Sequence, residues 1–178
     1  MVLNGDEIRG LIKKIKLIEG YIDLDKQITP NGFDLTVDEI HVFKERGALD
    51  FSNRERLLSE TGKRKPFKKS SQDKYGWWFL KKGVYKIVAN EICNIPRDLV
   101  ALAFPRTSLL RMGAFTQTGV WDAGFTGKSE FILVIENPKG IRIKENARIV
   151  QLVFLRVKEV KEGYKGIYNL NLKFKTQE

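Results

Sequence analysis

The sequence has 178 residues, of which 42% are hydrophobic, including 11 Phe and 3 Trp, and this is enough for one domain with a sizeable core. Its 32 Lys and Arg residues exceed its 22 Asp and Glu residues, and the net charge of +10 favours an acidic partner, either a nucleic acid or a small polyanion. With one cysteine, Cys93, and one histidine, His41, the chain cannot form an intrachain disulfide or assemble the His/Cys ligands of a zinc deaminase or structural zinc site. Any metal must therefore be a hard cation bound by oxygen atoms.

The sequence contains no run of 18 apolar residues and no basic segment followed by an apolar one. We therefore expect a soluble, cytoplasmic protein without a membrane partner. No RNA-binding motif, zinc finger or helix-turn-helix pattern accompanies the positive charge, so nucleic acid is not the expected partner. Apolar neighbours of Cys93 favour a buried thiol over a nucleophile.

The first 20 residues have the pattern of a short amphipathic helix. Asn4 is followed three residues later by Glu7, as in a capping box. The apolar residues that follow recur at helical spacing along one face: Ile8, Leu11, Ile12 and Ile15.

A period of two replaces the helical pattern after the turn Asn31-Gly32. Apolar and polar residues alternate over residues 33–37, which predicts one strand, and residues 40–42 predict a second short strand. His41 lies in this second strand, so we expect a surface or half-buried strand residue and not a catalytic base.

Residues 47–74 are polar and basic without clear periodicity, which predicts a long loop excursion between strands. Many short β-rich runs follow, separated by turn signals such as Lys82-Gly83 and Asn137-Pro138-Lys139-Gly140. This spacing predicts an all-β barrel or sandwich, with residues 1–178 forming a single domain. The last segment, residues 163–178, is charged with isolated aromatic residues, and it suits either an ordered closing arm or a frayed end.

Residues 104–131 carry the side chains that a phosphate-bearing nucleoside needs. The first half reads Pro105-Arg106-Thr107-Ser108-Leu109-Leu110-Arg111, in which guanidinium and hydroxyl groups can donate to phosphate oxygens. In the second half Asp122 lies on a turn and Phe125 follows, so that a carboxylate can deprotonate water and a ring can pack on a sugar. Taken alone, Asp122-Ala123-Gly124 is equally a structural turn, and both arginines suit surface ion pairs.

Four segments, in this order, resemble the central motifs of the dUTPase and dCTP deaminase superfamily. They are Ile28-Thr29-Pro30-Asn31-Gly32-Phe33-Asp34-Leu35, Phe104-Pro105-Arg106-Thr107-Ser108-Leu109-Leu110-Arg111-Met112-Gly113, Gly119-Val120-Trp121-Asp122-Ala123-Gly124-Phe125-Thr126-Gly127 and Ala147-Arg148-Ile149-Val150-Gln151-Leu152-Val153-Phe154. The resemblance implies a distorted jelly-roll of the dUTPase-like β-clip type, with a short N-terminal helix. It also implies a homotrimer with active sites between subunits, Mg²⁺ and a deoxynucleoside triphosphate substrate.

The same resemblance implies a role for individual residues. Asp122 corresponds to the base that activates water, Phe125 to the ring that stacks on deoxyribose, and Asp34 to the aspartate that binds the metal through water. Substrate contacts are implied for Arg106, Thr107, Ser108, Arg111 and Gln151, and, through the backbone next to the pyrimidine, for Thr118, Gly119 and Val120. Near the C-terminus, Tyr164 and Tyr168 resemble the lid residues of the deaminase branch.

Two departures from the family patterns distinguish hydrolase from deaminase. The deaminase branch has a catalytic Glu ten residues after the aspartate, where this chain has Ile132, although Glu130 or Glu136 shares strand parity with that position. The Gly-rich arm of the usual dUTPases is also missing, as in the archaeal-type dUTPases that this chain resembles most closely.

These patterns predict a dUTP diphosphatase that hydrolyses dUTP to dUMP and pyrophosphate with Mg²⁺. The alternatives are a dCTP deaminase, with or without the hydrolase activity, that uses a displaced Glu, and a nucleotide-binding protein of the same fold without turnover. Uracil and cytosine differ by one donor–acceptor pair, so the sequence leaves the base preference open.

Overall fold

The computed structural model describes residues 1–169. Of the predicted C-terminal arm, residues 170–178 lie outside the described residues. The helices are α1 (Gly5–Ile15), α2 (Leu24–Gln27) and α3 (Thr107–Arg111). The strands are β1 (Ile18–Glu19), β2 (Ile28–Thr29), β3 (Gly32–Phe43), β4 (Thr61–Arg64), β5 (Trp77–Leu80), β6 (Gly83–Asn94), β7 (Leu99–Pro105), β8 (Ala114–Gln117), β9 (Thr126–Ile135), β10 (Ile141–Lys144) and β11 (Arg148–Arg156).

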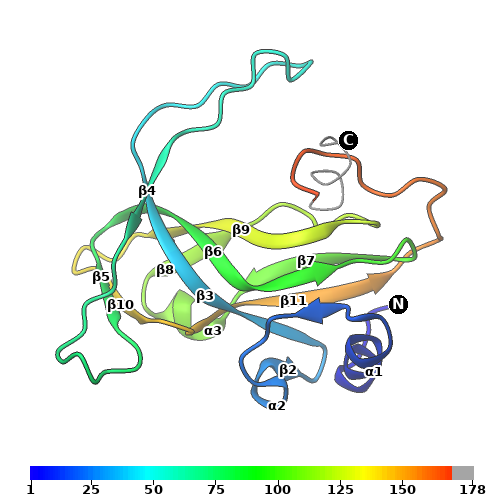
Figure 1. Ribbon diagram of the computed structural model, residues 1–178, viewed down its shortest axis with the longest axis horizontal. Helices are drawn as coiled ribbons and strands as arrows, with labels where there is room; N and C mark the ends of the chain where they lie inside the picture. Colours follow the sequence, from blue (N-terminus) through cyan, green and yellow to red (C-terminus); the bar gives the residue numbers. More distant parts are fainter. Residues whose placement is uncertain (170–178) are drawn as a thin grey trace.

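Nine of these strands form one antiparallel sheet in the order β7-β11-β3-β6-β9-β8, with β1, β2 and β4 attached at its sides. The two ends of this order meet through the bridge between Ala101 of β7 and Trp121, which exchange two backbone hydrogen bonds of 3.0 Å. The sheet is therefore a nearly closed barrel, and the all-β prediction is confirmed (Figure 1). Strands β5 and β10 form a separate two-stranded sheet.

Helix α1 occupies part of the predicted 1–20 segment and ends early. The capping box is present, because Asn4 accepts from the Glu7 backbone N–H and Glu7 accepts from that of Asn4. The helix ends at Ile15 because Lys16 adopts a left-handed conformation with φ of 55°. None of the helices in residues 1–169 combines the length and apolar character needed to cross a membrane.

Residues 33–42 form one long strand, where the sequence predicts two short ones. Strand β3 runs through both, and a register shift in its pairing with β6 between Val37 and Glu39 accounts for the change of phase between the two apolar patterns. The inward side chains of β3 belong to the central core, with Phe33, Leu35 and Ile40 fully buried. Cys93 is buried as predicted, and burial raises the pKa of its thiol to about 12.

The predicted basic excursion, residues 47–74, contains one strand that the sequence did not indicate. Strand β4 pairs with the end of β3, and residues 44–60 extend from this pair away from the barrel (Figure 1). The extension has internal structure, because Ala48 and Leu57 exchange backbone hydrogen bonds and Lys44 pairs with Glu60 at 2.6 Å. Four apolar side chains on it are exposed: Leu49, Phe51, Leu57 and Leu58.

Candidate active site

A buried carboxylate joins three strands at the first part of the site. The register places Asp34 of β3 opposite Gln151 of β11, and Gln151 opposite Phe104 of β7. Arg106, two residues after Phe104, therefore reaches Asp34, and its Nε lies 3.0 Å from Asp34 Oδ2. Arg148 at the start of β11 approaches the same oxygen at 3.4 Å. The fold thus brings Asp34, Arg106 and Gln151 onto neighbouring strands.

The Asp34 carboxyl is 2% exposed, and burial raises its pKa, while Arg106 and then Arg148 act against that rise. Within residues 1–169, neither of its carboxylate oxygens accepts a hydrogen bond of good geometry. Gln151 instead donates to the Thr29 hydroxyl at 2.9 Å. Asp34 therefore orients two guanidinium groups and keeps acceptor capacity for water.

Helix α3 displays the other predicted phosphate-binding side chains. Arg106 precedes the helix, and Leu109, which is 2% exposed, fixes its inner face to the core. The side chains on the outer face are exposed: Thr107, Ser108 and Arg111. Short hydroxyls and a guanidinium group on an anchored turn can donate to phosphate oxygens with little reorganisation.

The second part of the site is the turn that carries Asp122. Trp121 is buried before it, and its indole N–H donates to the Ser129 hydroxyl at 2.9 Å. The Asp122 carbonyl accepts from the Phe125 N–H at 3.0 Å, and Gly124 takes φ of 83°, which a side chain rarely adopts. The Asp122 carboxylate itself is exposed. An acidic group is thus held in solvent by a turn whose backbone is fixed.

Residues after β11 fold back onto this turn. The Tyr164 N–H donates to the Ala123 carbonyl at 2.8 Å, and the rings of Phe125 and Tyr164 meet edge to face at 5.6 Å. Asn169 donates to the carbonyls of Gly124 and Tyr164. The described part of the predicted arm is therefore packed against Asp122 and not frayed, and Tyr168 lies in the same segment, half exposed.

Burial raises the pKa of the Tyr164 hydroxyl, and the charges of Tyr168 and Asp122 act in the same direction. Arg56, from the extension of residues 44–60, acts in the opposite direction. The extension therefore places Arg56 within electrostatic reach of Tyr164, which sequence reasoning missed because a basic stretch without periodicity gives no indication of where it folds.

Within one protomer the two parts of the site are well separated. Trp121 pairs with Ala101, five residues before Arg106 along β7, and this corresponds to about 16 Å of strand. Residues 118–120 link β8 to Trp121, with Gly119 and Val120 exposed and Thr118 half-buried. The fold therefore places the Phe125 ring and the Asp122 carboxylate together in one part of the site. The phosphate-binding side chains form the other, separate part.

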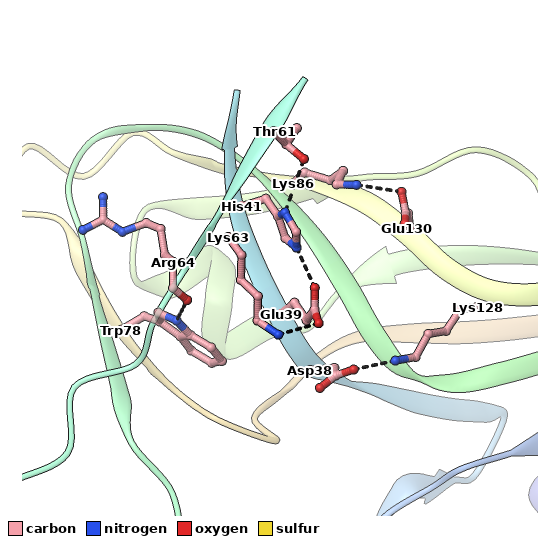
Figure 2. A network of polar contacts seen from close by, with 10 residues as sticks. All are labelled: Asp38, Glu39, His41, Thr61, Lys63, Arg64, Trp78, Lys86, Lys128 and Glu130. Carbon is pink, nitrogen blue, oxygen red and sulfur yellow. Dashed lines mark hydrogen bonds and ion pairs between the residues drawn. The ribbon is translucent and has the colours of Figure 1, made fainter. Parts of the chain in front are cut away.

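The two displaced glutamates both form surface ion pairs. Glu130 pairs with Lys86 across β9 and β6 at 3.1 Å (Figure 2), and Glu136 pairs with Lys82 at 2.6 Å. Each carboxylate is more than half exposed. His41 is half-buried on β3 as predicted, between Glu39 at 2.7 Å and the Thr61 hydroxyl at 3.3 Å (Figure 2).

A buried network behind Asp34 was also missed. Glu91 of β6 is fully buried and accepts hydrogen bonds from Thr36 N–H at 3.0 Å and from Gln27 Nε2 at 2.7 Å. Gln27 Nε2 also donates to the Asp34 carbonyl at 2.8 Å. The sequence held a signal for it, since Glu91 shares strand parity with the inward-facing Ala89 and Cys93.

Replacing Gly124 by Ala is expected to detach the C-terminal segment from the Asp122 turn. The added Cβ would lie 2.5 Å from the Gly163 Cα at a φ that costs about 1–2 kcal/mol for alanine. Limited proteolysis should then cleave the segment around Gly163 faster. Gly119→Ala is the matched control, because its Cβ meets nothing within 4 Å, and equal cleavage rates in both variants would contradict this packing.

Several known proteins are similar to this chain in sequence. The chain is 47% identical over 169 residues to a probable deoxyuridine 5'-triphosphate nucleotidohydrolase of Methanosarcina mazei, covering 94% of this chain and 95% of the relative. It is 37% identical over 144 residues to the deoxyuridine 5'-triphosphate nucleotidohydrolase of Methanocaldococcus jannaschii, covering 81% and 88%.

Among solved structures, the fold is similar to that of a 2'-deoxycytidine 5'-triphosphate deaminase from Agrobacterium tumefaciens, with a TM-score of 0.61 and 22% identity. That match covers 88% of this chain and 48% of the deaminase chain, so this chain spans about half its length. The sequence profile described as dCTP deaminase-like matches residues 2–157. With most of its length matched by the profile and by relatives of more than 30% identity, this chain belongs to the dCTP deaminase-like family.

Proposed function

We propose that this protein is a dUTP diphosphatase, which hydrolyses dUTP to dUMP and pyrophosphate. The observation that carries this proposal is the exposed Asp122 carboxylate on a fixed turn, with the Phe125 ring and Tyr164 beside it. The names of the relatives described above support the same substrate. The accessible, ordered settings of these residues support the roles that the sequence motifs imply for them.

In this proposal Asp122 takes a proton from the water that attacks the α-phosphorus. Phe125 packs against the deoxyribose, and the backbone of residues 118–120 reads the pyrimidine edge. Arg106, Thr107, Ser108, Arg111 and Gln151 neutralise and orient phosphate oxygens, and Tyr164 and Tyr168 close over the bound nucleotide. Hydrolysis then needs no covalent intermediate, in keeping with a buried Cys93.

Mg²⁺ belongs to this proposal as the cofactor. Residues 1–169 contain no group of three or more His, Cys, Asp and Glu side chains placed to hold a metal ion. This suits Mg²⁺, which binds through one carboxylate, waters and substrate phosphates in many phosphate-transferring sites. Asp34, whose carboxylate oxygens keep acceptor capacity, would hold it through water. The ion would supply charge neutralisation on the phosphates.

We also propose the homotrimer with shared sites. The separation of Asp122 from Arg106, which lies five residues beyond the Ala101–Trp121 bridge along β7, supports sites completed by a neighbouring subunit. Exposed apolar side chains support extensive association: Leu102 and Phe104 on β7, and Leu49, Phe51, Leu57 and Leu58 on the extension. The cytoplasmic location and the single domain over residues 1–178 stay predictions from the sequence.

Separate incubation with dUTP and dCTP in the presence of Mg²⁺ tests the reaction. We expect pyrophosphate from dUTP and no ammonia from dCTP, because Ile132 replaces the deaminase glutamate and both nearby glutamates are engaged in ion pairs. Ammonia from dCTP would establish the deaminase alternative. If neither product forms, the alternative of a nucleotide-binding protein without turnover holds.

Asp122→Asn is expected to lower kcat for dUTP about a thousandfold or more, since an amide cannot take the proton from water, while substrate affinity changes little. Asp98→Asn is the control, because the Asp98 carboxylate forms a surface ion pair with Arg156 at 3.7 Å and has no role in the proposed chemistry. Steady-state kinetics and a binding titration with a non-hydrolysable dUTP analogue give both quantities. Unchanged kcat in Asp122→Asn would reject this residue as the base.

Co-expression of the inactive variants Asp122→Asn and Arg106→Gln tests the shared site. If Asp122 and Arg106 of different subunits meet, random trimers regain about a quarter of the wild-type sites, because each site draws one residue from each of two neighbours. If both residues act within one subunit, no mixed trimer gains activity. Thermal melting of each variant alone shows whether it folds, and light scattering gives the molar mass.

A further inference from the structure

A cavity of about 170 Å³ lies beside the Asp34 cluster, between α3 and the β5–β10 sheet. Four cationic side chains line it: Arg106, Arg142, Lys144 and Arg148. No Asp or Glu of the described chain is among its lining residues. A concave site with four cations and no lining carboxylate concentrates a field that attracts anions.

Two of the cations come from a part of the fold that no motif indicated. In the β5–β10 sheet, Ile141 and Ile143 are buried, so the alternate residues Arg142 and Lys144 share the outer face. The Arg142 guanidinium lies 5.6 Å and the Lys144 ammonium 5.5 Å from the centre of the Trp77 ring. Both like charges therefore lie against one indole ring on the same face of the sheet.

These two charges have no acidic counterpart in residues 1–169. Asp34 balances part of the charge of Arg106 and Arg148, but Arg142 and Lys144 form no ion pair among the described residues. Glu145, next along the chain, accepts the Gly76 backbone N–H instead. Like charges at short distance repel each other, and an anion bound between them relieves that repulsion.

On another basic face of the molecule, the cations do have acidic counterparts. On the surface formed by β3, β4, β6 and β9, three lysines are paired with carboxylates: Lys63 of β4 pairs with Glu39, Lys86 of β6 with Glu130, and Lys128 of β9 with Asp38 (Figure 2). The cations at the cavity therefore differ from those on this face in having no carboxylate partner for Arg142 and Lys144 among the described residues.

We propose that Arg142 and Lys144, positioned by Trp77, bind the terminal phosphates of a nucleoside triphosphate whose inner phosphates contact Arg106 and Ser108. This inference rests on the proposed function, because it extends the phosphate-binding side of that site. Ser108 and Arg106 line the same cavity as the two β10 cations, so one polyphosphate chain can contact α3 and β10 together. The β10 cations then select triphosphates over monophosphates.

The double variant Arg142→Gln/Lys144→Gln of the full chain tests this site with inorganic tripolyphosphate as the probe. Calorimetry is expected to show about a tenfold or greater loss of affinity, the effect of losing two partly exposed charge-assisted contacts. Lys13→Gln/Lys14→Gln removes the same charge from α1 and should bind tripolyphosphate as the wild type does. Equal affinity in the Arg142/Lys144 variant and the wild type would overturn the proposal.

Kinetics with dUTP distinguish this inference from the proposed function. The Arg142/Lys144 variant is expected to raise KM for dUTP about tenfold, with a much smaller change in kcat and in inhibition by dUMP. If the wild type hydrolyses dUTP and the variant keeps its KM, the inference fails and the proposed function stands. If the variant loses tripolyphosphate binding but the wild type releases no pyrophosphate from dUTP, the polyphosphate site stands and the proposed function fails.

Discussion

The buried Asp34 carboxylate and the two guanidinium groups beside it are the interaction on which the site depends. Asp34 lies on β3, Arg148 begins β11 and Arg106 follows β7, so one charge links three strands that are distant in sequence. Only the Asp34 carboxyl of this cluster is buried, since both guanidinium groups are about a third exposed, and removing either arginine leaves the buried charge less compensated. The position of Arg106 next to the phosphate-binding side chains of α3 is thus set by strand register and by the charge that it compensates.

Closure of the barrel fixes the other half of the site. The backbone bridge between Ala101 and Trp121, together with the buried Trp121 indole, sets where the following turn begins. Asp122 is then held in solvent by the turn, since its side chain forms no hydrogen bond or ion pair within residues 1–169. A carboxylate that is placed in advance needs no reorganisation when water and substrate arrive, which is the condition for efficient proton transfer.

Positive charges are paired with carboxylates on one face of this protein and are in excess at another. Surface lysines on β4, β6 and β9 are paired with carboxylates, whereas four cations around the cavity between α3 and β10 have only Asp34 as a partner among the described residues. Arg56 adds a further positive charge within electrostatic reach of Tyr164. A small polyanion is therefore attracted to the cavity between α3 and β10, where cations are in excess.

The sequence by itself determined the all-β class, the capped first helix, the buried Cys93 and the identity of the chemical groups, because these follow from periodicity, capping and residue type over short distances. It also gave Asp122 its turn, since Gly124 permits a positive φ. Only the tertiary structure decided that Arg148 would join Arg106 on Asp34, that Glu91 would support this cluster from behind, and that Trp77 would collect two cations. Each of those contacts joins strands whose register depends on the whole sheet, and register between distant strands is set by core packing that no local pattern records.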